Sequence, residues 1–150
     1  MASEDKIREG ARPFLEDGED VLAAFVARPR GWTQSNAGSL HLGLHQQGQS
    51  RDGAEAAGFA LASPMALAIT DRRLLSFSMG AQAGMGMGGG VKELVGEAPL
   101  PDVDAIKVKR LLLGKVVELQ VRGESFKLEA GAGANVKGVA EAFERSRQPA

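Results

Sequence analysis

Apolar and polar residues alternate strictly in the second half of the chain, and this pattern restricts the fold more than any other feature of the sequence. Ile106 and Val108 alternate with Lys107 and Lys109, and the same period of two returns over residues 115–122. Because successive side chains of a β-strand point to opposite faces, such segments form strands with one buried and one solvated face. The sequence therefore predicts an antiparallel β-sheet.

Proline and glycine divide the chain into seven such segments. Pro99, Pro101, Gly114 and Gly123 separate those of the second half, and a turn-like Asp71-Arg72 pair separates two apolar runs in the first half. The predicted strands cover residues 20–28, 65–70, 74–77, 91–97, 103–110, 115–122 and 125–130.

Two helices are expected at the ends of this strand series. The first covers about residues 4–15, and Pro13 should end or kink it. The second covers about residues 135–146, where the apolar residues from Val136 to Phe143 fall at i, i+3, i+4 and i+7. This helix should cover one end of the sheet.

A chain of 150 residues has the usual length of one domain, so we expect residues 1–150 to form a single domain. A long polar insert, rich in Gln, Ser and Gly, covers about residues 32–63, and a glycine-rich connection follows at 80–90. Inside the insert, the alternation of Leu40, Leu42 and Leu44 leaves an extra edge strand as an alternative.

Composition limits the compartment and the classes of partner. The absence of cysteine excludes disulfides and thiolate metal sites. The acidic start lacks the basic and apolar regions of a secretory signal, and no stretch approaches the roughly 20 apolar residues of a membrane span. We therefore expect a cytoplasmic protein. The net charge of −1, with neither half strongly basic, predicts no nucleic-acid partner.

Catalytic, cofactor-binding and metal-binding patterns are weak. His41 and His45 have no acidic residue between them, as is usual for loop histidines. Gly84, Gly86 and Gly89 have the spacing of a dinucleotide fingerprint, but a strand-like segment follows where that motif requires a helix. The sequence offers no nucleophile, base and orienting group together. We predict no enzymatic activity, no cofactor and no metal site.

Three stretches resemble the bacterial pleckstrin-homology-like and GRAM-like domains. They are Leu15-Glu16-Asp17-Gly18-Glu19, Leu67-Ala68-Ile69-Thr70-Asp71-Arg72-Arg73-Leu74-Leu75, and Val103 to Leu113, followed by the helix from Asn135. Domains of this family commonly show a Gly-Glu pair before the first strand and a Leu-Thr-(Asp/Asn)-x-Arg-Leu hairpin. The resemblance implies a mainly β fold, a partly open barrel or sandwich of about seven antiparallel strands capped by a C-terminal helix. It also implies a binding module.

A protein partner or self-association is the expected function, and peripheral binding to anionic lipid is the alternative. Cationic side chains at the end of the first strand, and others around the turn between the strands at 103–110 and 115–122, are candidates for binding an anionic ligand. Two apolar side chains are candidate anchors for a protein partner. The candidate residues are Arg28, Arg30, Trp32, Lys107, Lys109, Arg110, Leu112 and Lys115.

Each candidate also has a purely structural interpretation. Glu118 should lie opposite Lys107 or Lys109 on the solvated face, which would make the cations part of an ordinary cross-strand charge pattern. Leu112 lies within a run of three leucines at an expected turn. It could be covered by the N-terminal helix, by a second copy of the chain or by a partner.

Overall fold

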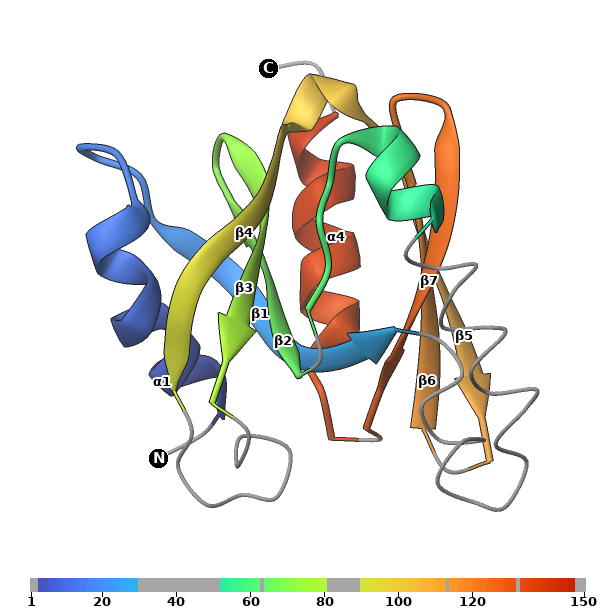
Figure 1. Cartoon of the computed structure of the whole chain (residues 1–150), viewed down its shortest axis with the longest axis horizontal. Helices are drawn as coiled ribbons and strands as arrows, with labels where there is room; N and C mark the ends of the chain where they lie inside the picture. Colours follow the sequence, from blue (N-terminus) through green and yellow to red (C-terminus); the bar gives the residue numbers. More distant parts are fainter. Residues whose placement is uncertain are drawn as a thin grey trace.

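A seven-stranded antiparallel sheet and two flanking helices dominate the part of the chain that the computed structural model describes, residues 3–29, 52–62, 64–80, 90–112, 114–131 and 133–147 (Figure 1). The strands are β1 (Val21–Pro29), β2 (Met65–Thr70), β3 (Arg73–Met79), β4 (Val91–Pro99), β5 (Val103–Leu111), β6 (Gly114–Val121) and β7 (Glu124–Ala130). The helices are α1 (Ser3–Ala11) and α4 (Val136–Ser146), with 3₁₀ turns η1 (Arg12–Phe14) and η3 (Leu100–Asp102).

Strand β1 joins two halves of the sheet, whose order is β4-β3-β2-β1-β7-β6-β5. Its residues from Val21 to Ala27 pair with β2, whereas Arg28 and Pro29 pair with β7. The sheet therefore divides at β1 into β1–β4 and β5–β7, and α4 stands between the halves (Figure 1). This mainly β architecture, with a short N-terminal helix and a C-terminal helix, confirms the predicted fold class.

The main core lies between the two halves of the sheet and α4. Its largest members include Phe25, Leu67, Leu119 and Phe143, all at most 2% exposed. The predicted spacing of α4 is confirmed for Val136, Val139 and Phe143, but the fourth buried position is Ala142 rather than Ala140. Ala140 is only half-buried and lies at the margin of this core.

A second apolar cluster lies on the outer face of β1–β4, beneath α1. Ile7 and Ala11 of α1 are fully buried there against residues that include Ala66 and Phe77. Helix α1 ends at Ala11, so the predicted effect of Pro13 is confirmed. Strand β2 is buried at all six positions because α1 covers one face and the main core covers the other. The expected solvated face is therefore absent from β2, whereas β4 at the sheet edge keeps exposed positions.

Residues 52–62, which we call the cap segment, cover the sheet where its two halves diverge. Residues 52–57 are helical, and Phe59 forms an isolated antiparallel bridge with Gly96 of β4. At its other side, Arg122 donates a hydrogen bond to the carbonyl of Ala57 (2.7 Å). Phe59 stacks on Phe126 with ring centroids 5.7 Å apart. This segment follows Arg30, Trp32, the alternating leucines and both histidines, which lie outside the described residues.

Candidate functional site

The four cations around the β5–β6 hairpin do not share one surface. The register pairs Lys107 with Glu118 and Arg110 with Lys115. Because positions alternate along a strand, Lys107 and Lys109 lie on the outer face of the half-sheet, whereas Arg110 and Lys115 lie on the face toward α4. The predicted pairing of Glu118 with Lys107 is confirmed, and the four cations lie on both sides of the hairpin.

The outer face is a mixed-charge surface. Across the strands, Lys107, Glu118 and Lys127 form one row of register partners. The neighbouring row runs from Lys109 through Val116 to Glu129 and Arg28, and its two central members are buried. Alternating signs across adjacent strands stabilise a solvated sheet face without any ligand. Arg28, whose guanidinium pKa is lowered by desolvation, therefore lies in this pattern rather than beside Arg110.

A groove of about 660 Å³ lies on the opposite side, between β5 and α4. Its floor is apolar and includes Ile106, Val108 and Ala140, and Val108 is 41% exposed. Charged side chains line its rim, among them Arg110 at the hairpin end and Glu144 near the end of α4. Arg110 forms no hydrogen bond or ion pair with any residue that the structure describes.

The backbone of β5 presents an unpaired edge beside this groove. Leu111 and Gly114 close a two-residue turn, so the N–H and C=O groups of Leu111 point toward β6. The alternation of an antiparallel ladder then directs the N–H and C=O groups of Ile106, Val108 and Arg110 away from β6. Within the described ranges, no hydrogen bond reaches these groups.

Both ends of the groove are fixed by side chains that bond to backbone carbonyls. At the hairpin end, Lys115 Nζ donates to the carbonyl of Ala134 (3.2 Å) just before α4. At the other end, Arg147 Nη1 donates to the carbonyl of Asp104 (2.7 Å), and its guanidinium lies over the ring of Phe143. These two contacts hold α4 alongside β5. The groove between them is therefore present in the folded protein without a ligand.

The opposite edge of the sheet is protected. Phe59 pairs with Gly96 of β4, and the close approach of α1 to Val91 leaves no room for a side chain at Gly10. Unpaired strand edges invite pairing with other chains, so folded proteins usually cover or interrupt them. Of the two edge strands in the described structure, β4 is contacted at Gly96 and at Val91, whereas β5 has no such bridge.

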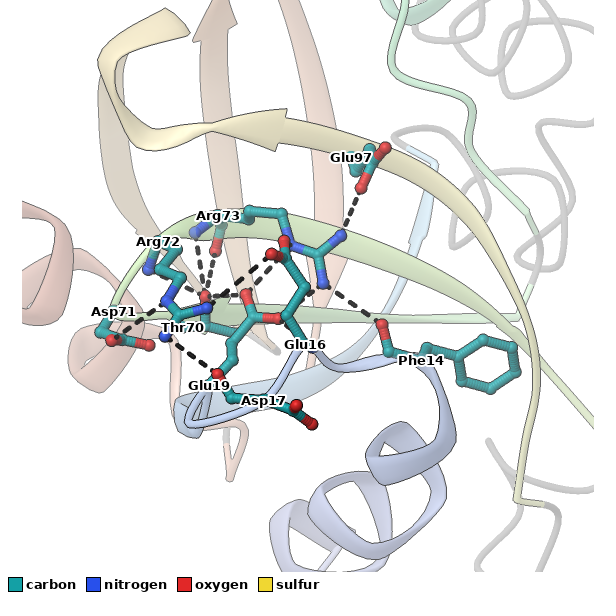
Figure 2. Close-up of polar contacts among 9 residues, drawn as sticks. All are labelled: Phe14, Glu16, Asp17, Glu19, Thr70, Asp71, Arg72, Arg73 and Glu97. Carbon is teal, nitrogen blue, oxygen red and sulfur yellow. Dashed lines mark hydrogen bonds and ion pairs between the residues drawn. The ribbon is translucent and has the colours of Figure 1, made fainter.

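A second polar cluster joins the two motifs that carry the family resemblance (Figure 2). The Arg73 guanidinium donates to both carboxylate oxygens of Glu19, at 3.0 Å from Nε and 2.6 Å from Nη2. Arg73 also bonds to the carbonyl of Phe14 and to Glu97, while the Thr70 hydroxyl donates to Glu19 (2.7 Å). Glu19 of the Gly-Glu pair and Arg73 of the hairpin therefore bind each other directly.

This cluster is a structural latch rather than a reactive site. Hydrogen bonds from Arg73 lower the pKa of Glu19 to about 2, although burial acts in the opposite direction. The same pairing raises the pKa of Arg73. The Glu19 side chain is fully buried and accepts bonds from three directions, including the Glu16 amide (2.9 Å). Each charged group is neutralised by the other. This Glu19–Arg73 pair, which we call the latch, ties the segment before β1 to the β2–β3 hairpin.

Leu112 is the most exposed large apolar side chain of the described residues, at 98%. Of the three alternatives for covering this leucine, the N-terminal helix is excluded, because α1 packs against β1–β4 instead. Sequence reasoning found Arg110, Lys115 and Leu112, but it missed the groove residues of α4 such as Lys137 and Glu144. The positions of Lys137 and Glu144 along the helix did not indicate that they line a groove, because that depends on which strand lies beside α4.

The solved structures that match this chain include two bacterial proteins. One is a DUF1696-family protein with a pleckstrin-homology domain from Shewanella loihica PV-4, 11% identical, with a TM-score of 0.47 over 99% of this chain and 100% of that chain. The other is a pleckstrin-homology domain from Shewanella amazonensis SB2B, 14% identical, with a TM-score of 0.49 over 99% of this chain and 90% of that chain. No family model and no curated protein matches the sequence.

Neither a metal cluster nor a membrane-spanning helix occurs among the described residues. No group of three or more His, Asp or Glu side chains there could hold a metal ion. No helix in the same ranges is long and apolar enough to cross a bilayer.

Proposed function

We propose that this chain is a non-catalytic binding module that docks an extended segment of a partner protein along β5. The observation that carries this proposal is the unpaired backbone edge at Ile106, Val108 and Arg110, directly beside the groove between β5 and α4. A segment added to this edge gains main-chain hydrogen bonds from β5 and places alternate side chains over the groove.

The groove has suitable dimensions and chemistry for such side chains. Its volume of about 660 Å³ is that of a typical ligand pocket, and its apolar floor has a charged rim. Val108 remains 41% exposed in the absence of a partner, so docking would bury apolar surface at the centre of the site. The occupant that fits is an extended peptide segment with apolar side chains at alternate positions.

The polar groups of the groove favour binding over catalysis. Among the described residues, its rim combines Lys, Arg and Glu side chains without a histidine or a nucleophile. The strongly shifted pKa values belong to Glu19 and Arg73, which are paired with each other in the latch. Active sites usually join perturbed titratable groups to an accessible cleft, and here the two features lie apart.

Selection from a phage-displayed random peptide library tests the proposal. The wild type serves as bait, and Val108→Pro serves for counter-selection. The Val108 N–H points away from β6, so proline there removes an edge donor while leaving the β5–β6 ladder intact. We expect peptides that bind the wild type only and that slow the amide exchange of Ile106, Val108 and Arg110. Enrichment of peptides that bind both proteins equally, or of none, would contradict strand addition at β5.

A further inference from the structure

The pairing of charges across the described strands has one exception, and it lies in the groove between β5 and α4. Three register pairs of the described sheet join charges of opposite sign, and these are Lys107 with Glu118, Glu118 with Lys127, and Arg28 with Glu129. The fourth pair joins two cations, Arg110 and Lys115. Like charges directly opposite each other destabilise a sheet. The hairpin end of the groove therefore carries a repulsion that the other charged pairs avoid.

No carboxylate of the described residues forms an ion pair with either of these two cations. Lys115 is half-buried, and its Nζ donates to the uncharged carbonyl of Ala134. Lys137 lines the same end of the groove, but Glu141 lies 3.8 Å from it and offsets its charge. An anionic group beside Arg110 would offset the repulsion that remains.

The excess of positive charge is confined to one end of the groove. Helix α4 runs opposite to β5, because its start is bonded to Lys115 and its last turn to the start of β5. Arg110 therefore lies beside the start of α4, whereas Glu144 and Arg145 line the other end, where their charges are of opposite sign. The middle of the groove is apolar at Val108. A ligand that matches the groove along its length has an anionic group at the hairpin end only.

Docking along β5 gives this anionic group a defined place in the bound segment. Arg110, Val108 and Ile106 occupy alternate positions of β5, and their side chains line the groove. In an added strand, the residue opposite each of them points its side chain to the same face of the sheet. The acidic residue therefore lies two positions from one apolar residue of the segment and four positions from the next.

We propose that the segment bound at β5 runs antiparallel to it and carries an aspartate or glutamate opposite Arg110. Apolar side chains follow at the second and fourth positions, opposite Val108 and Ile106. The antiparallel direction is favoured because every strand pair of the described sheet is antiparallel and because such ladders are slightly more stable than parallel ones. This inference rests on the proposed docking at β5, to which it adds the composition and direction of the occupant.

Competition among three phage-displayed peptide libraries tests the order of residues. All three contain two apolar positions separated by one residue, flanked by random positions. An acidic residue stands two positions before the apolar pair in the first library and two positions after it in the second, and glutamine stands before the pair in the third. On the wild type, we expect the acid-first library to be enriched about fivefold over each of the others, the discrimination that one cross-strand charge pair can give. High salt should reduce this preference.

Charge reversal identifies the cation that selects the acidic residue. Arg110→Glu should abolish the preference for the acid-first library, and it should fold, because the new carboxylate would lie opposite Lys115. Lys109→Glu is the matched control, since it makes the same change on the outer face of β5 and should keep the preference. A nitroxide label at the acidic end of an enriched peptide should broaden the amide signal of Arg110 more than that of Ala105.

The outcomes distinguish this proposal from the docking itself. Enrichment of the acid-last or glutamine library, by peptides that bind the wild type but not Val108→Pro, would overturn the proposed order and leave docking at β5 standing. Enrichment of no library, or of peptides that bind Val108→Pro equally well, would overturn both proposals. An unchanged preference in Arg110→Glu, or stronger broadening at Ala105, would overturn the assignment of the acidic residue to Arg110.

Discussion

At the scale of single residues, the latch between Glu19 and Arg73 fixes the position of the segment before β1 against the β2–β3 hairpin. The Glu19 side chain is fully buried and that of Arg73 is 13% exposed, which makes this the most buried ion pair of the described residues. Its members are 54 residues apart in sequence. Loss of Arg73 would leave the buried Glu19 carboxylate without a cation, whereas loss of Glu19 would leave Arg73 with the exposed carboxylate of Glu97.

Glu19→Gln should destabilise the protein by about 1.5 to 3 kcal/mol, because the Arg73 guanidinium would lose its only fully buried charged partner and keep the exposed carboxylates of Glu97 and Glu16. Urea unfolding measures the effect. Glu16→Gln is the control: Glu16 also lies near Arg73, at 3.8 Å, but its side chain is 62% exposed, so its loss should change the stability by less than about 1 kcal/mol. Equal losses in the two variants would show that the latch does not stabilise the fold.

The same pair gives the stability a pH dependence of known sign. The pKa of Glu19 is lowered from its ordinary value of 4.5 to about 2 in the folded protein, so the unfolded state binds its proton first as the pH falls. The contribution is complete above about pH 5, and about 2 kcal/mol of it is lost by about pH 3. The stability difference between the wild type and Glu19→Gln should therefore narrow on acidification. A constant difference from about pH 6 to pH 3 would contradict this assignment.

Residue-level prediction succeeded where a motif was local and failed where a role depends on the assembled fold. The Gly-Glu pair and the Arg73 hairpin were recognisable in the sequence, but their contact joins segments far apart in the chain. Lys107 and Arg110 lie on one predicted strand, which is confirmed, but the single positive patch predicted from them is divided between two faces. Their separation onto two faces follows from the period of two, yet the groove beside Arg110 requires knowledge of where α4 packs.

At the scale of secondary-structure elements, the two edges of the sheet differ in protection. The cap segment pairs with β4 at Gly96, and Ser76 Oγ donates to the carbonyl of Ala60 (2.7 Å) beside it. No comparable element of the described structure pairs with β5. The difference explains how the sheet can offer one edge for docking without exposing both to uncontrolled association.

Gly96→Ala should loosen the cap segment. An added Cβ would lie 2.6 Å from Ser76 Oγ and 2.8 Å from the carbonyl oxygen of Ala60, so the cap segment or β3 would have to move. We expect a loss of about 1 to 3 kcal/mol in the free energy of unfolding, measured by urea titration. Gly90→Ala is the control, because no atom lies within 4 Å of its Cβ. A Gly96→Ala protein as stable as Gly90→Ala would mean that the close approach does not exist.

Two proline substitutions in β5 should have opposite effects on folding. Val108→Pro removes an outward-pointing N–H and should cost little stability, whereas Lys109→Pro removes a ladder bond to β6 and should cost about 3 kcal/mol or more. Thermal unfolding of both variants provides the comparison. Similar melting temperatures would show that the two amides do not point in opposite directions.

The elements themselves were largely predictable, because their periods are local properties of the sequence. All seven predicted strands are present in the described structure, and α4 follows its predicted apolar spacing except at Ala140. The burial of both faces of β2 was not predictable from strand periodicity, since it depends on α1 packing across the sheet. The order of strands, which makes β5 an edge, is likewise a tertiary property.

At the scale of the whole molecule, shape and charge give the two ends of the long axis different properties. The end with α1 is closed by the second apolar cluster and is rich in carboxylates. The other end carries the open edge of β5, the groove and the cationic hairpin. The net charge of −1 conceals this asymmetry, because it averages over both ends. The functional surfaces that we propose all belong to the β5 end.

Amide hydrogen exchange along β5 of the isolated protein, followed by NMR, tests the central claim that this edge is available for docking. We expect alternating protection along the strand. The amides of Lys107 and Lys109 should exchange slowly because they bond to β6, and those of Ile106, Val108 and Arg110 should exchange quickly because they face outward. Uniform protection along the strand would show that the edge is already covered, and would contradict docking of a partner segment at β5.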